Sequence, residues 1–322
     1  MTTRFRAYAP ASAANLSVGF DLLGAALKPV DGSVLGDEIY IEKGSEGCPF
    51  NLKLEGRFAH KLPDDPKKNI VYDAYLLYKE EARKKGFEVC DVSMVLRKNL
   101  PVCSGLGSSA SSVVCAVVAL DAVNGSKFSD QELIRMMGAL EGKISGSVHY
   151  DNAAPCFFGG LQLIVGEGGI ISRTLKDFDD WYFVSCFPGI KVSTNAARKI
   201  LPEKYERRDC ITYARRLAAF TDACHRGDAR IAAMCLKDVI AEPYRESLIP
   251  GLKEARAFGE EHGALATGIS GSGSSVFSVY DDLEKAAQMK EYLERNFIAN
   301  EDGFCHICKI DRRGAYAERV EN

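Results

Sequence analysis

The sequence predicts an α+β protein built from two domains. Its 322 residues, of which 46% are hydrophobic, are enough to build two cores. Segments with apolar residues at helical spacing and segments with strand-like alternation occur in both halves of the chain. The second half orders them as an elaborated β-α-β-β-α-β unit, which predicts an antiparallel sheet with helices on one face. We therefore expect domains over residues 1–167 and 168–322.

The elements of the first half follow from local patterns. Apolar residues recur at three- and four-residue spacing over 70–85, and Gly86 predicts the end of that helix. Residues 10–21 and 146–155 are expected to be loops, because they combine small residues with a few polar side chains. Alternating or apolar runs predict strands over residues 5–9, 37–43, 48–54, 92–96 and 156–165.

The second half contains a loop that is too rich in glycine for a simple hairpin turn. This loop, residues 268–275, reads Gly-Ile-Ser-Gly-Ser-Gly-Ser-Ser and joins two expected strands. It is a candidate for close backbone approach to a ligand. The expected strands of this half are 170–175, 181–187, 265–269, 276–280 and 304–310, and the expected helices are 210–225, 229–240, 252–261 and 282–296.

A glycine and serine run over residues 101–112 leads into an apolar helix that we expect to end near Val123. Gly105 and Gly107 can adopt positive φ, so the loop N–H groups and the first helical turn can converge on a phosphate group. Because serine is also a common helix cap, an ordinary N-cap explains this stretch equally well when it is taken alone.

Two better-known phosphate motifs do not fit this run. The dinucleotide fingerprint G-x-G-x-x-A matches residues 105–110, but it requires a buried strand directly before it and an acidic residue about 20 positions later. The preceding Arg-Lys-Asn-Leu-Pro is polar, and the nearest downstream acid, Asp121, lies within the expected helix. A Walker loop is excluded as well, because the Gly142-Lys143 pair lacks the remaining motif residues.

We call residues 101–112 the phosphate cradle. Polar side chains that could act together with it occur elsewhere in the chain. Ser129 to Glu132 forms a capping-box pattern that starts a helix over residues 131–141 and delivers Glu141 to a glycine-rich exit. The loop that follows concentrates His149, Asp151 and Asn152, a composition that suits a functional site better than packing. A single histidine is more often structural, so the interpretation depends on the cluster.

The charge balance gives no reason to expect a macromolecular or membrane partner. Lysine and arginine total 41 against 44 acidic residues, a net charge of −3, which does not favour binding to nucleic acid or to an anionic membrane. The N-terminus has no apolar signal region, and no apolar run reaches the roughly 18 residues that a spanning helix needs. We expect a cytoplasmic protein that binds a small molecule.

The 11 cysteines are scattered without regular spacing, as reduced thiols in a core would be. Cys305-His306-Ile307-Cys308 is a C-x-x-C pattern that could indicate zinc or redox chemistry. No second pair accompanies it, and a structural zinc ion needs about four ligands. A terminal strand is the simpler interpretation.

Taken together, the motifs resemble those of the GHMP kinase superfamily. Pro10-Ala-Ser-Ala-Ala-Asn-Leu16 is similar to the first superfamily motif, residues 101–111 to the second, and residues 268–275 to the third. Within the superfamily the chain most resembles the homoserine kinases, through residues 17–21, 149–155, 188–194 and 242–245. This resemblance extends over almost the whole chain.

The resemblance implies an ATP:L-homoserine O-phosphotransferase that makes O-phospho-L-homoserine for threonine synthesis. It implies a first domain like domain 2 of ribosomal protein S5 and a second, ferredoxin-like domain. The ATP phosphates would contact Pro101, Val102, Cys103, Ser104, Gly105, Leu106, Gly107, Ser108, Ser109, Ala110 and Ser111. Ser109 and Glu141 would bind Mg²⁺, and the catalytic candidates are Asp151, Asn152 and Glu141. The substrate L-homoserine would contact Asn15, Asp21, His149, Asp151, Asn152, Thr194, Arg198 and Arg245.

The chemistry of these residues fits those roles. Asp21 can pair with an ammonium group, while Arg198 and Arg245 can hold a carboxylate as planar forks. Asp151 could accept the hydroxyl proton or only orient the substrate, and both roles stay open. The rival functions are a GHMP-type kinase for another small alcohol such as mevalonate, and a binding protein that has lost the chemistry. A homodimer is the default expectation, because two-fold dimers are the commonest assemblies.

Overall fold

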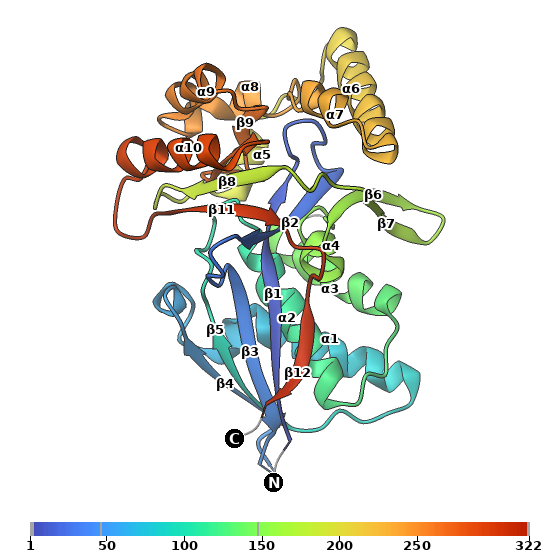
Figure 1. The fold of residues 1–322 in the computed structure, drawn as a ribbon. Coiled ribbons are helices and arrows are strands. Elements are labelled where there is room, and N and C mark those ends of the chain that lie inside the picture. The colour runs from blue at the N-terminus through green and yellow to red at the C-terminus, as the bar shows by residue number, and fades with distance from the viewer. Residues whose placement is uncertain (1–2, 46, 147, 321–322) are drawn as a thin grey trace.

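The first strand, β1 (Arg4–Ala14), joins two parts of one 12-stranded sheet. The computed structural model describes residues 3–45, 47–146 and 148–320, and every count below refers to these residues. Residues 4–10 of β1 pair with β3 (Gly36–Lys43), and residues 4–8 also pair with β12 (Tyr316–Val320). Residues 11–14 pair instead with β2 (Leu23–Pro29). The end of β1 therefore lies between the two parts of the sheet (Figure 1).

The first part of the sheet is covered on one face by three helices (Figure 1). Its strand order is β4 (Phe50–Glu55), β5 (Val92–Arg97), β3 and β1, with β12 on the other side of β1. The helices are α1 (Ile70–Lys85), α2 (Ser108–Val123) and α3 (Asp130–Ser145).

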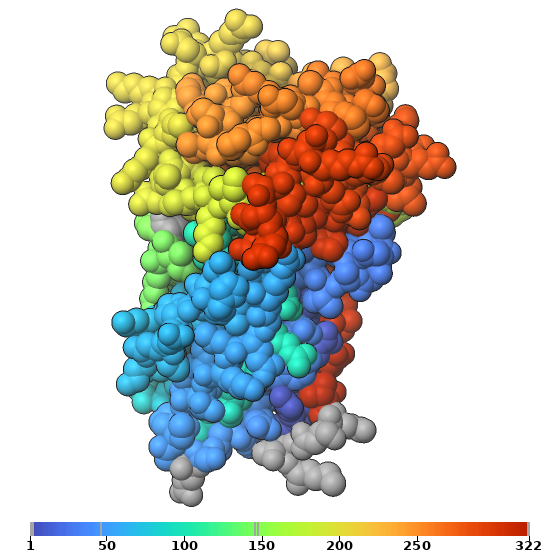
Figure 2. Space-filling model, turned by 90° about the vertical axis from the view of Figure 1, so that its left-hand side faces the viewer, coloured from blue at the N-terminus to red at the C-terminus, as the bar shows by residue number. Residues whose placement is uncertain are grey.

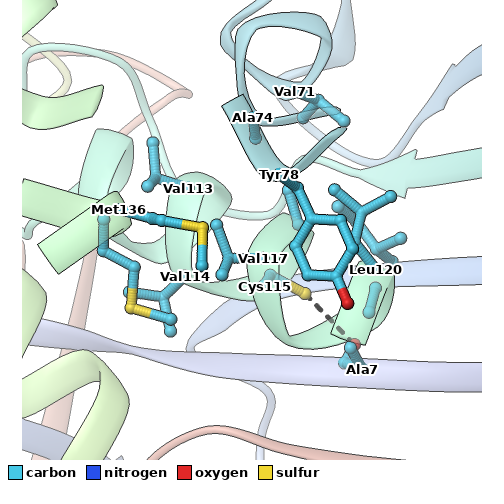
Figure 3. Close-up of a cluster of buried hydrophobic side chains, with 14 of the residues drawn as sticks. Ala7, Val71, Ala74, Tyr78, Val113, Val114, Cys115, Val117, Leu120 and Met136 are labelled. Atoms are coloured by element: carbon cyan, nitrogen blue, oxygen red, sulfur yellow. Dashed lines mark hydrogen bonds between the residues drawn. The ribbon is translucent and has the colours of Figure 1, made fainter. Parts of the chain in front are cut away.

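Helix α2 is the centre of this core. Figure 3 shows its apolar side chains, among them Val114 and Val117, between Tyr78 of α1, Met136 of α3 and the sheet. The Cys115 thiol donates to the carbonyl oxygen of Ala7 at 3.3 Å. An apolar surface on nearly every side explains why this helix is buried along its length, so its N-terminus is held in a fixed position.

The second part of the sheet has helices against both faces. Its order is β2, β11 (Phe304–Ile310), β8 (Tyr182–Phe187), β10 (Val276–Tyr280) and β9 (Ala266–Ile269). β11 pairs with residues 27–29 of β2, while β6 (Leu161–Glu167) pairs with residues 23–25 and in turn with β7 (Ile170–Leu175). Val184 and Cys186 of β8 pack with α9 (Leu252–Glu261) and α10 (Leu283–Asn296). Phe183 and Phe187 point the other way and join a cluster with α6 (Arg207–Arg226) and α7 (Ala229–Cys235). The expectation of helices on one face is wrong for this reason.

The structure corrects several expected elements. Residues 156–158, expected to begin a strand, end the helix α4 (Ala153–Phe158), and β6 starts only at Leu161. Gly159 and Gly160 both have positive φ, which separates the two elements. Helix α7 ends at Cys235 rather than near residue 240. Four elements were not expected from the sequence: β2, β12, α5 (Thr194–Lys199) and α8 (Glu242–Arg245). β1 also extends to Ala14, into residues that were expected to be a loop.

The last strands of the chain complete sheets that begin with the first strands. β11 pairs with β2, and β12 pairs with β1. In Figure 2 the residues from about 180 to 300 form the upper part of the molecule, while red atoms near the end of the chain reach down beside the blue ones. Within the described ranges, no helix has the length and apolar character needed to cross a lipid bilayer.

Candidate active site

The glycine loop before α2 closes over the N-terminus of that helix. Gly107 is the N-cap residue with φ of 63°, and Gly105 has φ of 84°. A Cβ at Gly107 would collide with the Ser12 hydroxyl, and one at Gly105 would collide with the carbonyl oxygen of Ser270. Among the described residues, no side chain caps this helix, so the serines are not ordinary N-caps. The first-turn N–H groups are therefore available to an anion.

The loop is held by the two other glycine- or alanine-rich motifs. Ser270 donates from its hydroxyl to the carbonyl oxygen of Gly105 at 2.7 Å, and the backbone N–H of Ser275 donates to Ser104 at 2.8 Å. On the other side, the N–H of Ser12 donates to Leu106 at 3.1 Å. Segments far apart in sequence thus fix one loop conformation.

Three residues of the expected phosphate loop, Pro101, Leu106 and Ser111, do not line the cavity that the rest of the loop borders. Leu106 is fully buried in an apolar cluster, and Pro101 is buried as well. The Ser111 hydroxyl donates to Ala9 O at 2.7 Å and accepts from Asp37 N at 3.0 Å. These two hydrogen bonds join α2 to the sheet, so the role of this hydroxyl is structural.

Ser109 and Glu141 meet where α2 and α3 pack together. The Ser109 hydroxyl donates to Glu141 Oε1 at 2.6 Å. Burial raises the pKa of Glu141, against the opposing effects of the Ser109 hydrogen bond and of Lys98. One hydroxyl and one carboxylate suit Mg²⁺, which keeps several waters and also binds substrate phosphates. The described residues contain no cluster of three or more His, Cys, Asp or Glu side chains that could hold a metal ion by itself.

A buried lysine, not foreseen from the sequence, lies under the start of α2. Lys98 Nζ forms an ion pair with Asp37 and donates to Ser108 O at 2.8 Å and to Ser112 Oγ at 2.9 Å. The Asp37 carboxylate also accepts from the backbone N–H groups of Asn99 and Leu100. This pair fixes the first turn of α2 against β3 and the chain after β5.

Apart from the phosphate cradle, the site contains a bidentate ion pair between Asp21 and Arg198. Arg198 Nη2 lies 2.9 Å from Asp21 Oδ1, and Nη1 lies 3.2 Å from Oδ2. Nη2 also lies 3.4 Å from His149 Nδ1. Burial and then Arg198 lower the pKa of His149, while Asp21 opposes them. Arg198 Nε is buried and finds no hydrogen-bond partner in the described parts of the chain.

The other expected substrate contacts surround this pair. Arg245 is buried, donates to the carbonyl oxygens of Ala197 and Gly271, and lies over the Phe20 ring at 5.2 Å. Asn15 Nδ2 donates to the same Gly271 oxygen at 2.9 Å. Thr194 Oγ1 lies 3.3 Å from the Ser272 hydroxyl.

Asp151 and Asn152 lie at the start of α4, between the phosphate cradle and the Asp21–Arg198 pair. Asp151 is 7% exposed. Burial raises its pKa to about 7, helped by the negative charges of Asp21 and Glu141 and opposed by Arg198. Asn152 Oδ1 accepts from the Ser12 hydroxyl at 2.9 Å, which places this amide beside Gly107.

One cavity of about 820 Å³ connects all of these groups. It is lined by every expected metal, catalytic and substrate residue and by most of the expected phosphate loop. Sequence reasoning missed an apolar end formed by Leu62, Pro63 and Ile70. Asn69 lies there too: its Oδ1 caps α1, and its buried Nδ2 has no partner within the described residues. The only signal for this end was the polar segment before α1.

The C-x-x-C pattern forms part of a strand, as the simpler interpretation predicted. Cys305 and Cys308 are buried on β11, and both thiols are free.

Comparison with known proteins places these features in a family. Residues 69–160 match the family model for the GHMP kinases N terminal domain, and residues 220–299 match the GHMP kinases C terminal model. A crystal structure of homoserine kinase from Cytophaga hutchinsonii is 28% identical with a TM-score of 0.87, covering 98% of this chain and 97% of that one.

Two further structures share the fold at lower identity. One, from Listeria monocytogenes and assigned provisionally as a homoserine kinase, is 21% identical with a TM-score of 0.71, covering 98% of this chain and 100% of that one. The mevalonate kinase of Methanococcus jannaschii is 14% identical with a TM-score of 0.68, covering 95% and 98%. The fold expected from the sequence is thereby confirmed.

Proposed function

Since the chain belongs to the GHMP kinases, we propose that it transfers the terminal phosphoryl group of ATP to the side-chain hydroxyl of L-homoserine. The observation that carries this proposal is the single cavity, with an anion cradle at the N-terminus of α2 and the Asp21–Arg198 pair in the same space. An amino-acid substrate carries an ammonium and a carboxylate, and these two side chains complement both.

Phosphoryl transfer depends mainly on charge neutralisation and on in-line positioning of the nucleophile. The first-turn N–H groups of α2 would hold phosphate oxygens, with Gly105 and Gly107 allowing close approach. Ser109 and Glu141 would hold a magnesium ion, which neutralises charge on the triphosphate when it is bound. The nucleoside would lie against the apolar end of the cavity, formed by Leu62, Pro63 and Ile70.

Homoserine would be held by both of its charged ends. Asp21 would bind the ammonium group, and Arg198 would bind the carboxylate. Arg245 already binds two backbone carbonyls through Nε and Nη1, so it would reach the ligand through its remaining N–H groups. Asp151 would orient the substrate hydroxyl toward the cradle.

A coupled assay for ADP release tests the proposal with homoserine, mevalonate, galactose and shikimate as acceptors. We expect turnover that needs Mg²⁺ and is greatest with homoserine. Absence of ADP above background with homoserine would overturn the assignment, and turnover with mevalonate alone would favour the rival kinase. No turnover with any acceptor, together with ATP binding, would favour a binding protein.

The remaining expectations stay predictions. They are a place in threonine synthesis, a cytoplasmic location, a homodimer, and a domain division between residues 167 and 168.

A further inference from the structure

The Glu242 side chain does not line the cavity, but its carboxylate binds three other segments of the chain. Oε1 accepts from the Ser17 hydroxyl at 2.7 Å and from the backbone N–H of Ile269 at 2.8 Å. Oε2 accepts from Arg256 Nη2 at 2.9 Å. Ser17 belongs to the loop after β1, and Ile269 is the last residue of β9, within the glycine-rich 268–275 segment. One buried side chain thus connects α8, α9 and both loops.

The loop that Glu242 holds has an unfavourable backbone conformation. Asn15, Leu16 and Ser17 have consecutive φ values of 71°, 45° and 58°, all in the left-handed region. Residues with a Cβ rarely adopt this conformation, and Leu16 is bulky as well. Such a conformation persists only where the surrounding structure fixes it. The Ser17–Glu242 hydrogen bond anchors the last of the three residues.

The same contacts fix the charged side chains of the substrate region. The backbone N–H of Asp21 donates to Asn15 Oδ1 at 3.0 Å, so the position of Asp21 depends on the strained segment. Arg245 follows Glu242 by one helical turn on α8. A shift of Glu242 would therefore move an acidic and a basic side chain of the site together.

We propose that Glu242 is a positioning residue for the amino-acid subsite, acting through the 15–21 loop and through Arg245 without touching the ligand. This inference rests on the proposed function for its kinetic consequence. Its structural part, that Glu242 fixes the 15–21 loop, stands apart from the identity of the substrate.

The test compares Glu242→Gln and Ser17→Ala with the control Glu246→Gln. Glu246 also binds Arg256, with Nη1 to Oε2 at 2.7 Å, but it does not bind Ser17 or Ile269. A glutamine at 242 has one carbonyl oxygen and one NH₂ group, so it cannot accept on both the Ile269 side and the Arg256 side of the side chain. Ser17→Ala removes the loop contact and leaves the Arg256 ion pair.

In steady-state kinetics, we expect both test variants to raise the KM for homoserine about tenfold, while the KM for ATP changes by less than about twofold. The control should leave both values within about twofold of the wild type. An unchanged homoserine KM in both test variants, or an equal rise in the KM for ATP, would overturn the positioning role.

Hydrogen–deuterium exchange of the intact, ligand-free protein gives a readout that does not depend on the substrate. The N–H groups of Asn15, Val18 and Gly19 are hydrogen-bonded in the loop. We expect their exchange to quicken about tenfold in the test variants and not in the control. Unchanged exchange in folded test variants contradicts the inference, even if the wild type proves to act on another alcohol. Faster exchange in a chain inactive on homoserine supports it and rejects only the substrate.

Discussion

The position of Asp151 is compatible with two roles, a general base and a group that only orients the substrate hydroxyl. Its carboxyl is buried between the phosphate cradle and the Asp21–Arg198 pair, and burial raises its pKa to about 7. A pKa near the working pH suits a general base, but a buried carboxyl beside a hydroxyl can also serve only to orient it.

Asp151→Asn separates these two roles. If Asp151 only orients the substrate, the amide holds the hydroxyl less well but still hydrogen-bonds to it. We therefore expect a higher KM for homoserine and a fall in kcat limited to about tenfold to a hundredfold. Steady-state kinetics with homoserine and ATP varied separately will measure both. A loss of several orders of magnitude in kcat with an unchanged KM would identify Asp151 as the base instead.

At the level of residues, the sequence predicted the side chains that belong to motifs and missed those that depend on tertiary packing. The residues expected to bind substrate and metal line one cavity, although their roles stay predictions. Lys98 was missed because its partner Asp37 lies 61 residues away, and no local pattern predicts that pairing. Asn69 was not singled out from the sequence, because only the structure shows that its Oδ1 caps α1 and that its buried Nδ2 has no partner within the described residues.

Among the elements, α2 combines a buried body with an N-terminus that depends on glycine. Gly107→Ala would place a Cβ against the Ser12 hydroxyl and 2.9 Å from Asn152 Oδ1, in a left-handed conformation. We expect the KM for ATP to rise and kcat to fall, each by at least about tenfold, because a small displacement of the first turn misplaces the phosphates.

Gly125→Ala is the matched control at the other end of the same helix. Gly125 also has positive φ, at 88°, but the atom nearest to its added Cβ is Lys127 Cε at 3.7 Å. Both variants carry the backbone cost of a left-handed alanine, and only Gly107→Ala disturbs the cavity. Equal losses of activity in the two variants would show that helix strain, rather than the cradle, is responsible.

The elements that the sequence predicted well carry their own start and stop signals. Helix α1 begins after the Asn69 cap and ends at Gly86, and α3 begins with the Ser129–Glu132 capping box. β2 gave no alternation because nearly all of its residues are buried. The half-exposed β12 gave none either, since only its pairing with β1 makes it a strand.

For the whole molecule, buried carboxyls make stability depend on pH. Burial raises the pKa values of Asp151 and Glu242 to about 7, whereas carboxyls in an unfolded chain titrate near about 4. The folded state then binds more protons than the unfolded state between these values. The contribution of both groups to the free energy of unfolding is therefore full at low pH and declines as the pH rises through about 7.

Asp151→Asn should remove part of this decline. We expect the ligand-free variant to gain about 1–3 kcal/mol relative to the wild type between pH 5 and pH 8, because a neutral amide replaces a carboxyl that ionises in a buried site. Urea denaturation at the two pH values measures the difference. The same offset from the wild type at both pH values would mean that Asp151 of the folded protein is already ionised at pH 5.

The sequence predicted the fold class and the existence of two parts. It did not predict that the chain returns from the second part to pair β12 with β1 in the first. Arg6 and Glu318 form a 2.7 Å hydrogen bond across 312 residues, a distance at which local patterns carry no information. The order of strands was therefore visible only from the structure.

The pairing of β12 with β1 also sets an order of events in synthesis. β1 leaves the ribosome well before its partner, because β12 lies much later in the chain. Until residues 316–320 emerge, one edge of β1 has unpaired N–H and C=O groups, as an open strand edge does. Contacts of such long sequence separation form slowly, because a long loop must close first. The nascent chain is thus exposed to edge-to-edge association until β12 has emerged, and this edge of the sheet is completed only then.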